Sequence, residues 1–473
     1  MKVYLAVTAA YFVAFAIVHT GLLLLAWREL RRAARARSVT ALRRAVRSPL
    51  APPISIIVPA YNEEAGIVDS VRSLLALDYP STEVVVLSDG STDDTVDRMI
   101  EAFDLRPAHR PTPPFLDHKP VRGVYVPRGR LRLILIDKEN GGKADSMNAG
   151  TNFARYPLVC FIDADSILEQ DALVKAALPF VEDPLRTIAT GGVIRIANGC
   201  RISRGRVLET ALPRAPIAMF QVVEYLRAFL AARTGWSAVN GLLIISGAFG
   251  LFRKDAVIAA DGFNTDTIGE DMELVVRLHR TMRELGRDYR IVYVPDPVCW
   301  TEAPETLGNL RGQRRRWQQG TLETLWLHRR MVFNPRYRAA GLISMPSMLI
   351  FEVIGPMVEL GGYVVSLLAA VTGVISVAAL LAFLALAFLY GMVLSLGAVV
   401  LEDAAFGRNP RWSDLRRILG YAVAENLGYR QITHLWKLEA FWRLWRGGGW
   451  GTMERKGLAR EVEDSLASEI GMR

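Results

Sequence analysis

The chain has 473 residues, a formal net charge of +9 and a hydrophobic content of 51%. A basic chain this apolar is typical of a membrane protein with a basic cytoplasmic face, or of a protein that handles anionic substrates. We expect no nucleic-acid partner, because the sequence has no zinc-ligand spacing, no helix-turn-helix pattern and no basic stripe with interleaved aromatic residues. The three cysteines, Cys160, Cys200 and Cys299, predict no disulfide framework.

An apolar segment near the N-terminus predicts a membrane helix. Residues 3–27 are long enough to cross a bilayer, for which about 20 residues suffice. A cleaved signal peptide is the alternative, but its apolar core is shorter and ends at small residues. Eight arginines lie between residues 28 and 47, opposed only by Glu29. The positive-inside rule therefore predicts a transmembrane helix over 1–30 and a basic cytoplasmic linker over 31–52.

Strand-like and helix-like segments then alternate. Apolar β-rich runs occupy 54–58, 83–88, 131–136, 158–163 and 188–194, and helix-like segments lie near 64–77, 92–103, 143–154 and 169–181. This alternation predicts an α/β domain with a mostly parallel central sheet and ligands at the carboxyl ends of its strands. Residues 105–130 contain six prolines and predict an irregular surface insertion. An amphipathic helix at 214–233, strands at 247–252 and 290–294, and helices from 270 and over 305–328 complete a domain over 53–335.

The remainder of the chain is mostly apolar. Residues 336–403 predict a pair of transmembrane helices with a turn near 370–375. Glu352 and Glu359 lie within this pair, and they face either the bundle interior or the membrane interface. Residues 404–446 predict an interfacial helix or an additional span, and residues 447–473 form a polar tail.

Polar motifs follow the first two strands. P-A-Y-N-E-E at 59–64 follows the first strand, and S-D-G-S-T-D-D-T at 88–95 follows the second. Both loops suit helix capping, and both also suit a pocket for a base and a ribose. Asp89 ends the second strand, where dinucleotide folds carry an acidic residue, but no G-x-G-x-x-G follows the first strand. This argues against NAD.

Three later motifs carry further charges. Lys143, in N-G-G-K-A-D, opens a helix and is either an anion ligand or a solvated lysine. Asp163 and Asp165 flank one alanine after an apolar strand, which suits Mg²⁺ or Mn²⁺ clamping a diphosphate. An aspartyl-phosphate phosphatase begins in the same way. Glu270 and Asp271 open another helix, where they either complement the helix dipole or act as a general base.

The stretch Gln313 to Trp317 has the sequence Q-R-R-R-W. On a helix over 305–328, Gln313, Arg316 and Trp317 share one face. The arginine fork suits a diphosphate, and the indole suits a sugar ring. The alternative is an amphipathic juxtamembrane helix whose arginines contact lipid headgroups.

Taken in order, these motifs resemble those of the membrane-integrated, processive family 2 glycosyltransferases, which include the cellulose, chitin, hyaluronan and poly-N-acetylglucosamine synthases. The resemblance covers roughly residues 50–335. It implies a GT-A-type nucleotide-binding domain with interfacial helices, and an enzyme that uses Mg²⁺ or Mn²⁺. The ordered set is far more specific than any one motif.

The resemblance also implies roles for the matching residues. Tyr61, Glu63 and Asp89 would hold the uridine of a UDP-sugar. Lys143 and Asp163 would lie near the base, ribose or diphosphate, with Glu270 also among the substrate-binding residues. Asp165 would ligate the metal, and Asp271 would be the general base. Gln313, Arg316 and Trp317 would hold the diphosphate and the acceptor sugar, whereas we expect Arg314 and Arg315 to point elsewhere, with lipid headgroups as one candidate partner.

The function implied is inverting sugar transfer from a UDP-sugar to the hydroxyl of a growing glycan, coupled to export of an exopolysaccharide. The protein would be a multi-pass protein of the plasma (inner) membrane with a cytoplasmic catalytic domain, in contact with membrane lipids. The sequence identifies no accessory or export protein. Two alternatives stay open: transfer of a single sugar to a lipid acceptor, and a transporter or scaffold with a degenerate nucleotide-binding domain.

Overall fold

The computed structural model describes residues 2–37, 48, 51–203, 205–406 and 412–444. The chain divides into two compact units. We call them the sheet unit (the described residues within 37–213 and 242–303) and the helical unit (the described residues within 1–36, 214–241 and 304–453). The predicted tail over 447–473 lies outside the described residues, as do parts of the linker over 31–52 and of the segment over 404–446. The predicted domain boundaries stay predictions.

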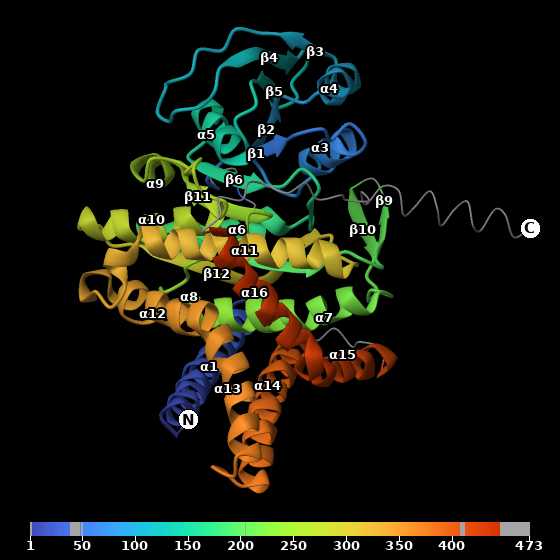
Figure 1. Ribbon diagram of the computed structural model, residues 1–473. Coiled ribbons are helices and arrows are strands. Elements are labelled where there is room, and N and C mark those ends of the chain that lie inside the picture. The colour runs from blue at the N-terminus through green and yellow to red at the C-terminus, as the bar shows by residue number, and fades with distance from the viewer. Residues whose placement is uncertain (1, 38–47, 49–50, 204, 407–411, 445–473) are drawn as a thin grey trace, which may run out of the picture. The chain divides into compact units, whose positions relative to one another are not determined.

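A ten-stranded sheet forms the core of the sheet unit, with the strand order β3-β4-β5-β2-β1-β6-β11-β8-β12-β7 (Figure 1). The strands are β1 (Ile54–Ala60), β2 (Thr82–Asp89), β3 (Leu105–Pro107), β4 (Val121–Pro127), β5 (Leu133–Lys138), β6 (Leu158–Ile162), β7 (Ile167–Leu168), β8 (Thr187–Ile196), β11 (Phe249–Arg253) and β12 (Arg290–Thr301). The central strands β5, β2, β1 and β6 are parallel, and β11 runs antiparallel to both of its neighbours. Every strand predicted between 54 and 294 is present, so the predicted α/β class is confirmed.

Helices cover this sheet. They are α3 (Ile67–Leu75), α4 (Thr95–Phe103), α5 (Lys143–Phe153), α6 (Ala172–Glu182), α9 (Lys254–Ala259) and α10 (Glu270–Glu284). The central strands are buried along nearly their whole length, as expected for parallel strands covered on both faces. Helix α3 buries Ile67, Val71 and Leu74, which share one face at i, i+4 and i+7. The apolar period of the sequence therefore sets which side of the helix meets the sheet.

The prediction of an irregular insertion over 105–130 is wrong for two stretches. Strands β3 and β4 pair antiparallel with each other, and β4 pairs antiparallel with β5. Pro107 and Pro127 stand at strand ends, where a missing N–H is tolerated. The six prolines are strong turn signals, and for this reason the two strands that extend the sheet at its edge were not predicted.

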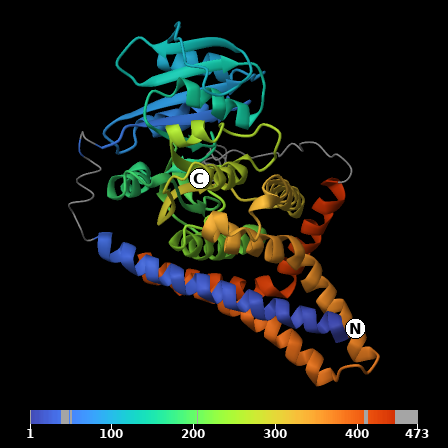
Figure 2. The same ribbon diagram turned by 90° about the vertical axis from the view of Figure 1, so that its left-hand side faces the viewer.

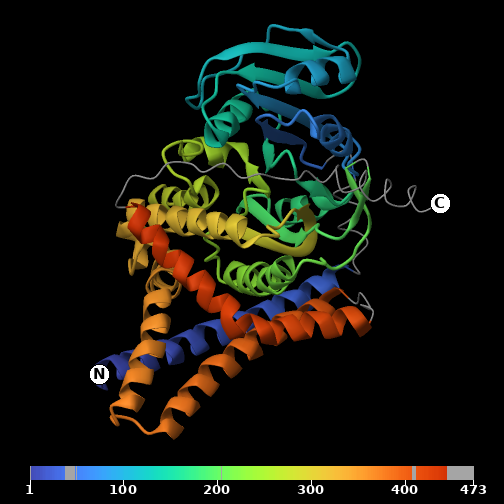
Figure 3. The same ribbon diagram turned by 45° about the vertical axis from the view of Figure 1, so that its right-hand side comes forward.

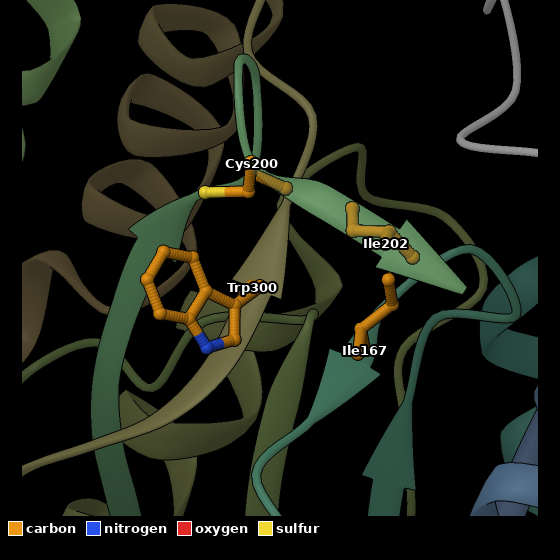
Figure 4. Packing of buried hydrophobic residues seen from close by; sticks show 5 residues of the cluster. Ile167, Cys200, Ile202 and Trp300 are labelled. Carbon is orange, nitrogen blue, oxygen red and sulfur yellow. The ribbon is translucent and has the colours of Figure 1, made fainter. Parts of the chain in front are cut away.

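A small hairpin of β9 (Arg201–Ser203) and β10 (Arg206–Glu209) packs on a satellite core (Figure 4). This core contains Ile167, Ala197, Cys200, Ile202 and Trp300. The Trp300 indole Nε1 donates to Glu169 Oε1 at 2.8 Å, so its polar edge is satisfied while its ring fills the core. Cys200 is a small buried side chain here, and all three cysteines are free thiols.

Among its described residues, the helical unit contains three helices that are long and apolar enough to cross a membrane: Val3–Ala33, Ala340–Val371 and Val377–Ala404. Its elements are α1 (Lys2–Arg37), α7 (Pro216–Tyr225), η1 (Leu226–Ala232), α8 (Arg233–Ala238), α11 (Leu307–Leu327), η2 (Arg329–Met331), η3 (Pro335–Tyr337), η4 (Ala340–Ser344), α12 (Met345–Ser347), η5 (Met348–Ile354), α13 (Gly355–Val371), α14 (Val377–Phe406), α15 (Trp412–Ala424), η6 (Glu425–Tyr429) and α16 (Arg430–Leu444). Helix α1 lies beside α14, where Tyr390 donates to the Ala16 carbonyl at 2.8 Å (Figure 2). The spans predicted over 1–30 and 336–403 agree with these candidates in position and composition.

The two carboxylates within the second candidate span face α16, which runs alongside α11 and α13 (Figure 3). Glu359 is buried, and its Oε1 accepts hydrogen bonds from Tyr11 at 2.9 Å and from Arg430 at 2.8 Å. Glu352 Oε2 lies 2.6 Å from Lys437 Nζ. Arg430 and Lys437 share one face of α16 at i and i+7, so one cationic stripe compensates both carboxylates. Of the two placements predicted for Glu359, the bundle interior is correct.

Helix α5 sits close to β1 and β2 because Gly150 has no side chain. A Cβ at position 150 would lie 2.9 Å from Leu87 Cδ1 and closer still to Ile57. We predict that Gly150→Ala destabilises the protein by about 1–3 kcal/mol through overpacking. Gly129→Ala is the matched control, since a Cβ there meets nothing within 4 Å. Thermal unfolding of both variants tests this, and equal midpoints would show that α5 can move away from the sheet without loss.

Candidate active site

The loops after β1 and β2 are joined to each other by side chains. Asn62 Oδ1 accepts from the Thr92 N–H at 2.8 Å, and the Glu63 N–H donates to Thr95 Oγ1 at 2.9 Å. Asn62 has a φ of 55°, a left-handed conformation that asparagine tolerates better than most residues. Tyr61 remains 52% exposed at the edge of this joint. The two loops therefore act as one surface at the carboxyl ends of adjacent strands, and Tyr61 offers an open ring on it.

Asp89 at the end of β2 holds the glycine loop that precedes α5. Its carboxylate accepts from the Gly141 N–H at 3.0 Å and from the Gly142 N–H at 2.8 Å. Its backbone carbonyl accepts from the Asn140 side chain at 2.7 Å. Because Asp89 is buried and multiply bonded, it fixes the loop that begins the helix of Lys143.

Lys138 is one of the residues of this site that the sequence analysis missed. It ends β5 and is fully buried, with Nζ 2.6 Å from Asp89 Oδ1 and 2.6 Å from Asp145 Oδ1. Asp145 in turn accepts from the Lys119 N–H at 2.9 Å. A buried charge needs paired and hydrogen-bonded partners. The signal for Lys138 was a charged residue ending an apolar strand directly before the N-G-G loop.

The structure brings Lys143, Asp163, Glu270 and Asp271 together. Lys143 Nζ lies 2.5 Å from Asp163 Oδ1 and 3.5 Å from Glu270 Oε1. Asp271 Oδ2 accepts from the Gly247 N–H at 2.8 Å, and its Oδ1 accepts from the Met272 N–H at 2.7 Å. A cation and three carboxylates thus converge from the first turn of α5, the end of β6 and the first turn of α10.

Gly247 was also missed, and its backbone is part of this cluster. A Cβ there would lie 2.8 Å from Lys143 Nζ and 3.5 Å from Asp271 Oδ2. A side chain at position 247 would displace the Lys143 ammonium from its present position. The signal in the sequence was a glycine directly before the predicted strand over 247–252.

The charges of the cluster shift one another's titration. Burial alone would lower the pKa of the Lys143 ammonium, but Asp163 and then Glu270 hold it above its ordinary value. Burial raises the pKa of the Glu270 carboxyl to about 7, against the opposing effect of Lys143. Perturbed carboxyl groups of this kind are typical of functional sites.

Asn148 connects α5 to the loop before α10, and these two helices carry Lys143 and Asp271. Its amide Nδ2 donates to the Phe263 carbonyl at 2.9 Å, and its Oδ1 accepts from the Phe263 N–H at 2.7 Å. Arg277 of α10 donates to the Gly262 carbonyl at 2.7 Å and to Glu273. The loop before α10 is therefore bonded both to α5 and to α10.

Asp163 and Asp165 stand together just after β6, as the sequence predicted. Within the described ranges, no group of three or more histidine, cysteine, aspartate or glutamate side chains is placed to hold a metal ion. Two carboxylates nevertheless fit Mg²⁺ or Mn²⁺, because such ions complete their shell with water and substrate phosphates. The Lys143 ammonium engages Asp163 Oδ1, so a metal ion there would share that carboxylate with the lysine.

The Q-R-R-R-W stretch lies on α11 in the helical unit. Gln313 is buried, and Trp317 is 43% exposed. The Arg314 guanidinium lies 4.3 Å from the centre of the Trp317 ring. Gln313, Arg316 and Trp317 do follow at i, i+3 and i+4 on this helix, and their roles stay predictions.

The suggested lipid contact is wrong for Arg314, and Arg315 also has a partner on another helix. Arg314 is buried, and its Nη2 donates to Glu224 Oε2 at 2.7 Å, which also accepts from the Tyr429 hydroxyl at 3.0 Å. Glu224 holds the pKa of Arg314 above its ordinary value against the effect of burial. Arg315 lies 3.8 Å from Glu439. Both arginines therefore join α11 to other helices of its own unit.

This difference predicts unequal effects of two neighbouring substitutions. Arg314→Ala leaves Glu224 without its cation, and breaking a buried pair costs about 3–5 kcal/mol. Arg315→Ala is the matched control, because its ion pair is long and such pairs contribute about 0–1 kcal/mol. Thermal unfolding in detergent measures both, and equal losses would contradict the assignment.

A second prediction concerns Lys138. Lys138→Met removes the shared cation of Asp89 and Asp145, so we expect a loss of about 3–5 kcal/mol of stability. Adding Asp145→Asn removes one of the uncompensated charges and should restore part of that loss. If Lys138→Met unfolds at the wild-type temperature, Lys138 does not hold the glycine loop.

Comparison with known proteins places these features in a family. A model described as glycosyl transferase family group 2 matches residues 158–395, and one described as glycosyl transferase family 2 matches residues 55–113. The chain is 32% identical to the poly-β-1,6-N-acetyl-D-glucosamine synthase of Staphylococcus aureus (strain COL) over 273 residues, 58% of this chain and 55% of that protein. The synthase of Staphylococcus epidermidis (strain ATCC 35984) is 31% identical over the same length. The chain spans about half the length of the curated relatives it matches.

A solved structure supports the fold. The mannosyltransferase of Pyrobaculum calidifontis, solved in complex with GDP-Man and Mn²⁺, matches 90% of this chain and 99% of its own with a TM-score of 0.51. At 20% identity this likeness is one of fold alone. The predicted GT-A-type α/β domain and the resemblance to family 2 are thereby confirmed, and the chain belongs to glycosyl transferase family group 2.

Proposed function

We propose that this protein is an inverting glycosyltransferase that moves a sugar from a UDP-sugar to the hydroxyl of a growing glycan. The observation that carries the proposal is the convergence of Lys143, Asp163, Glu270 and Asp271 at the carboxyl end of the sheet. Such a cluster offers a cation for a diphosphate and a carboxylate for a proton within one site. Family membership supports the same reaction class.

The donor would lie across the strand ends. Lys143 at the N-terminus of α5 suits the diphosphate, because its ammonium adds to the helix dipole and to the open N–H groups of the first turn. Tyr61, Glu63 and Asp89 would bound the uridine. Asp89 would act chiefly through the glycine loop, since its carboxylate already accepts from two backbone N–H groups and from Lys138.

Asp165, with Asp163 beside it, would hold Mg²⁺ or Mn²⁺. When bound, the ion would neutralise charge on the diphosphate of the donor. This assignment rests on the two carboxylates after β6 and on the preference of these ions for oxygen ligands.

Asp271 would act as the general base. Its carboxylate would take the proton of the acceptor hydroxyl as that oxygen bonds to the anomeric carbon of the sugar. The bond from that carbon to UDP breaks at the same time, and UDP leaves with the electron pair. Attack from the face opposite UDP inverts the anomeric centre. The Gly247 and Met272 N–H groups fix the orientation of the carboxylate for this step.

The acceptor and the setting are proposed from the helical unit. Gln313, Arg316 and Trp317 would contact the diphosphate and the acceptor sugar. The three candidate spans support a multi-pass protein of the plasma (inner) membrane, with its sheet unit in the cytoplasm. The similarity to poly-β-1,6-N-acetyl-D-glucosamine synthases favours UDP-N-acetylglucosamine as the donor and processive synthesis coupled to export.

The test uses the full-length protein in lipid nanodiscs with labelled UDP-N-acetylglucosamine. The wild type is expected to form a long, water-soluble glycan. A lipid-extractable product that carries one sugar would favour the alternative of single transfer to a lipid acceptor. Absence of any transfer from a panel of UDP-sugars would contradict the proposal.

Asp271→Asn should reduce turnover at least about 100-fold, because it removes the base while keeping the size of the side chain. We expect UDP binding to be retained. Asp266→Asn is the matched control, an exposed aspartate in the loop before α10. Wild-type turnover by Asp271→Asn would exclude Asp271 as the base.

Removal of divalent ions gives a separate prediction. EDTA should abolish transfer, and Mn²⁺ or Mg²⁺ in excess should restore it. Asp165→Asn should raise the Mn²⁺ concentration needed for half-maximal activity. Full activity in EDTA would show that the diphosphate is neutralised by Lys143 and other protein groups alone.

A further inference from the structure

The segment between α11 and α12 exposes basic and apolar side chains. Its exposed side chains between residues 326 and 338 are those of Trp326, Leu327, Arg329, Arg330, Phe333, Pro335, Arg336 and Arg338. We call this set the juxtamembrane surface. No aspartate or glutamate occurs from residue 324 to residue 351, so four arginines stand there without a carboxylate on their own stretch.

Unlike Arg314, which pairs with Glu224, these four arginines form no ion pair with a carboxylate of the described residues. Arg329 donates to the Trp326 carbonyl at 3.0 Å, and its guanidinium lies 4.9 Å from the centre of the Trp326 ring. Its charge is thereby placed beside an aromatic ring on the outside of the molecule.

The segment over residues 326–338 has a backbone held by hydrogen bonds, and it buries some side chains while exposing others. Met331 and Tyr337 are buried, and the Phe333 N–H donates to the Gly341 carbonyl at 2.9 Å. The Asn334 side chain accepts from the Arg336 N–H at 3.0 Å. This bonding fixes the backbone, so the outward direction of the remaining side chains is a property of the fold.

Two of the outward side chains are large and apolar. Phe333 has a φ of 59°, which bulky residues rarely adopt, and its side chain is 62% exposed. Trp326 is 70% exposed. A conformation that is unfavourable for phenylalanine and also leaves its ring in water suggests a non-aqueous neighbour for the ring. Tryptophan is the residue most typical of the level of lipid headgroups.

The position of the segment identifies that neighbour. The candidate span Ala340–Val371 begins directly after it. We propose that the juxtamembrane surface binds the anionic headgroups of membrane phospholipids, with its arginines on the phosphates and with Trp326 and Phe333 among the upper acyl chains. The interfacial lipid contacts expected for this part of the chain are thereby assigned to residues 326–338, whereas Arg314 and Arg315 hold helices together.

Charge removal tests the proposal without any sugar transfer, so its failure is distinct from failure of the proposed function. The variant Arg329→Gln/Arg330→Gln/Arg336→Gln/Arg338→Gln is compared with the full-length wild type by native mass spectrometry with phosphatidylglycerol. We expect its affinity for phosphatidylglycerol to fall about fivefold for each arginine, corresponding to ~1 kcal/mol each. Arg201→Gln/Arg206→Gln, on the exposed hairpin of β9 and β10, is the matched control and should bind as the wild type does.

A charge-preserving variant separates charge from folding. Replacing the same four arginines by lysine should keep most of the affinity, because headgroup attraction depends mainly on charge. Unchanged affinity in the glutamine variant, or an equal loss in the lysine variant, would overturn the proposal. Unfolding temperatures show that each variant compared is folded.

A label at position 326 tests the depth of the surface. Trp326→Cys can carry a fluorophore selectively, because the three native cysteines are buried. In nanodiscs that contain phosphatidylglycerol, we expect quenching by lipids brominated on the acyl chain and little quenching by iodide. Leu185→Cys, on the sheet unit, should show the reverse. Quenching of the label at 326 by iodide alone, or by neither agent, would mean that water or another protein covers the surface.

Discussion

The ion network of Lys138, Asp89 and Asp145 is the constraint on which the site of the sheet unit depends. A fully buried ammonium can be maintained only while both carboxylates stay beside it. In that position Asp89 also accepts from two N–H groups of the glycine loop. The loop sets where α5 begins, and α5 carries Lys143. Thus the buried charge of Lys138 fixes the position of Lys143, the proposed ligand of the diphosphate.

Much of the fold could be predicted from the sequence because its signals are local. The runs of β1, β2, β5 and β6 are mostly apolar, and α3 buries one face with a helical period. The strands β3 and β4, at one end of the sheet, escaped prediction because their prolines lie at the strand ends, where pairing tolerates them. Proline is a local signal, whereas edge pairing depends on a partner strand elsewhere in the chain.

In the candidate site, too, local signals could be predicted and contacts between distant residues could not. Lys143, Asp163, Glu270 and Asp271 are found by motif because each follows a strand or opens a helix. Lys138, Gly247 and Asn148 are not, since their importance lies in contacts across the fold that no spacing encodes. Arg314 is a related case. Within Q-R-R-R-W its type is unremarkable, and only Glu224 on another helix gives it a structural role. Sequence patterns therefore identify groups that face a ligand better than groups that hold those groups in place.

In the helical unit, Glu359 and Glu352 would be costly in an apolar bundle without compensation. Arg430 and Lys437 on α16 supply it from a distant part of the sequence. Helix α16 is thus attached to the candidate span by charge as well as by packing. Neither partner predicts the other from local sequence, because the spacing between them exceeds 70 residues.

The paired hydrogen bonds of Asn148 have a mechanical consequence. The Asn148 amide bonds both the N–H and the carbonyl of Phe263, as a paired β-strand would. We therefore expect α5 and the loop before α10 to move together. Arg277 extends this connection into α10. Lys143 and Asp271 therefore cannot separate without breaking these bonds. The proposed diphosphate ligand and the proposed base would thus keep one spacing throughout a reaction cycle.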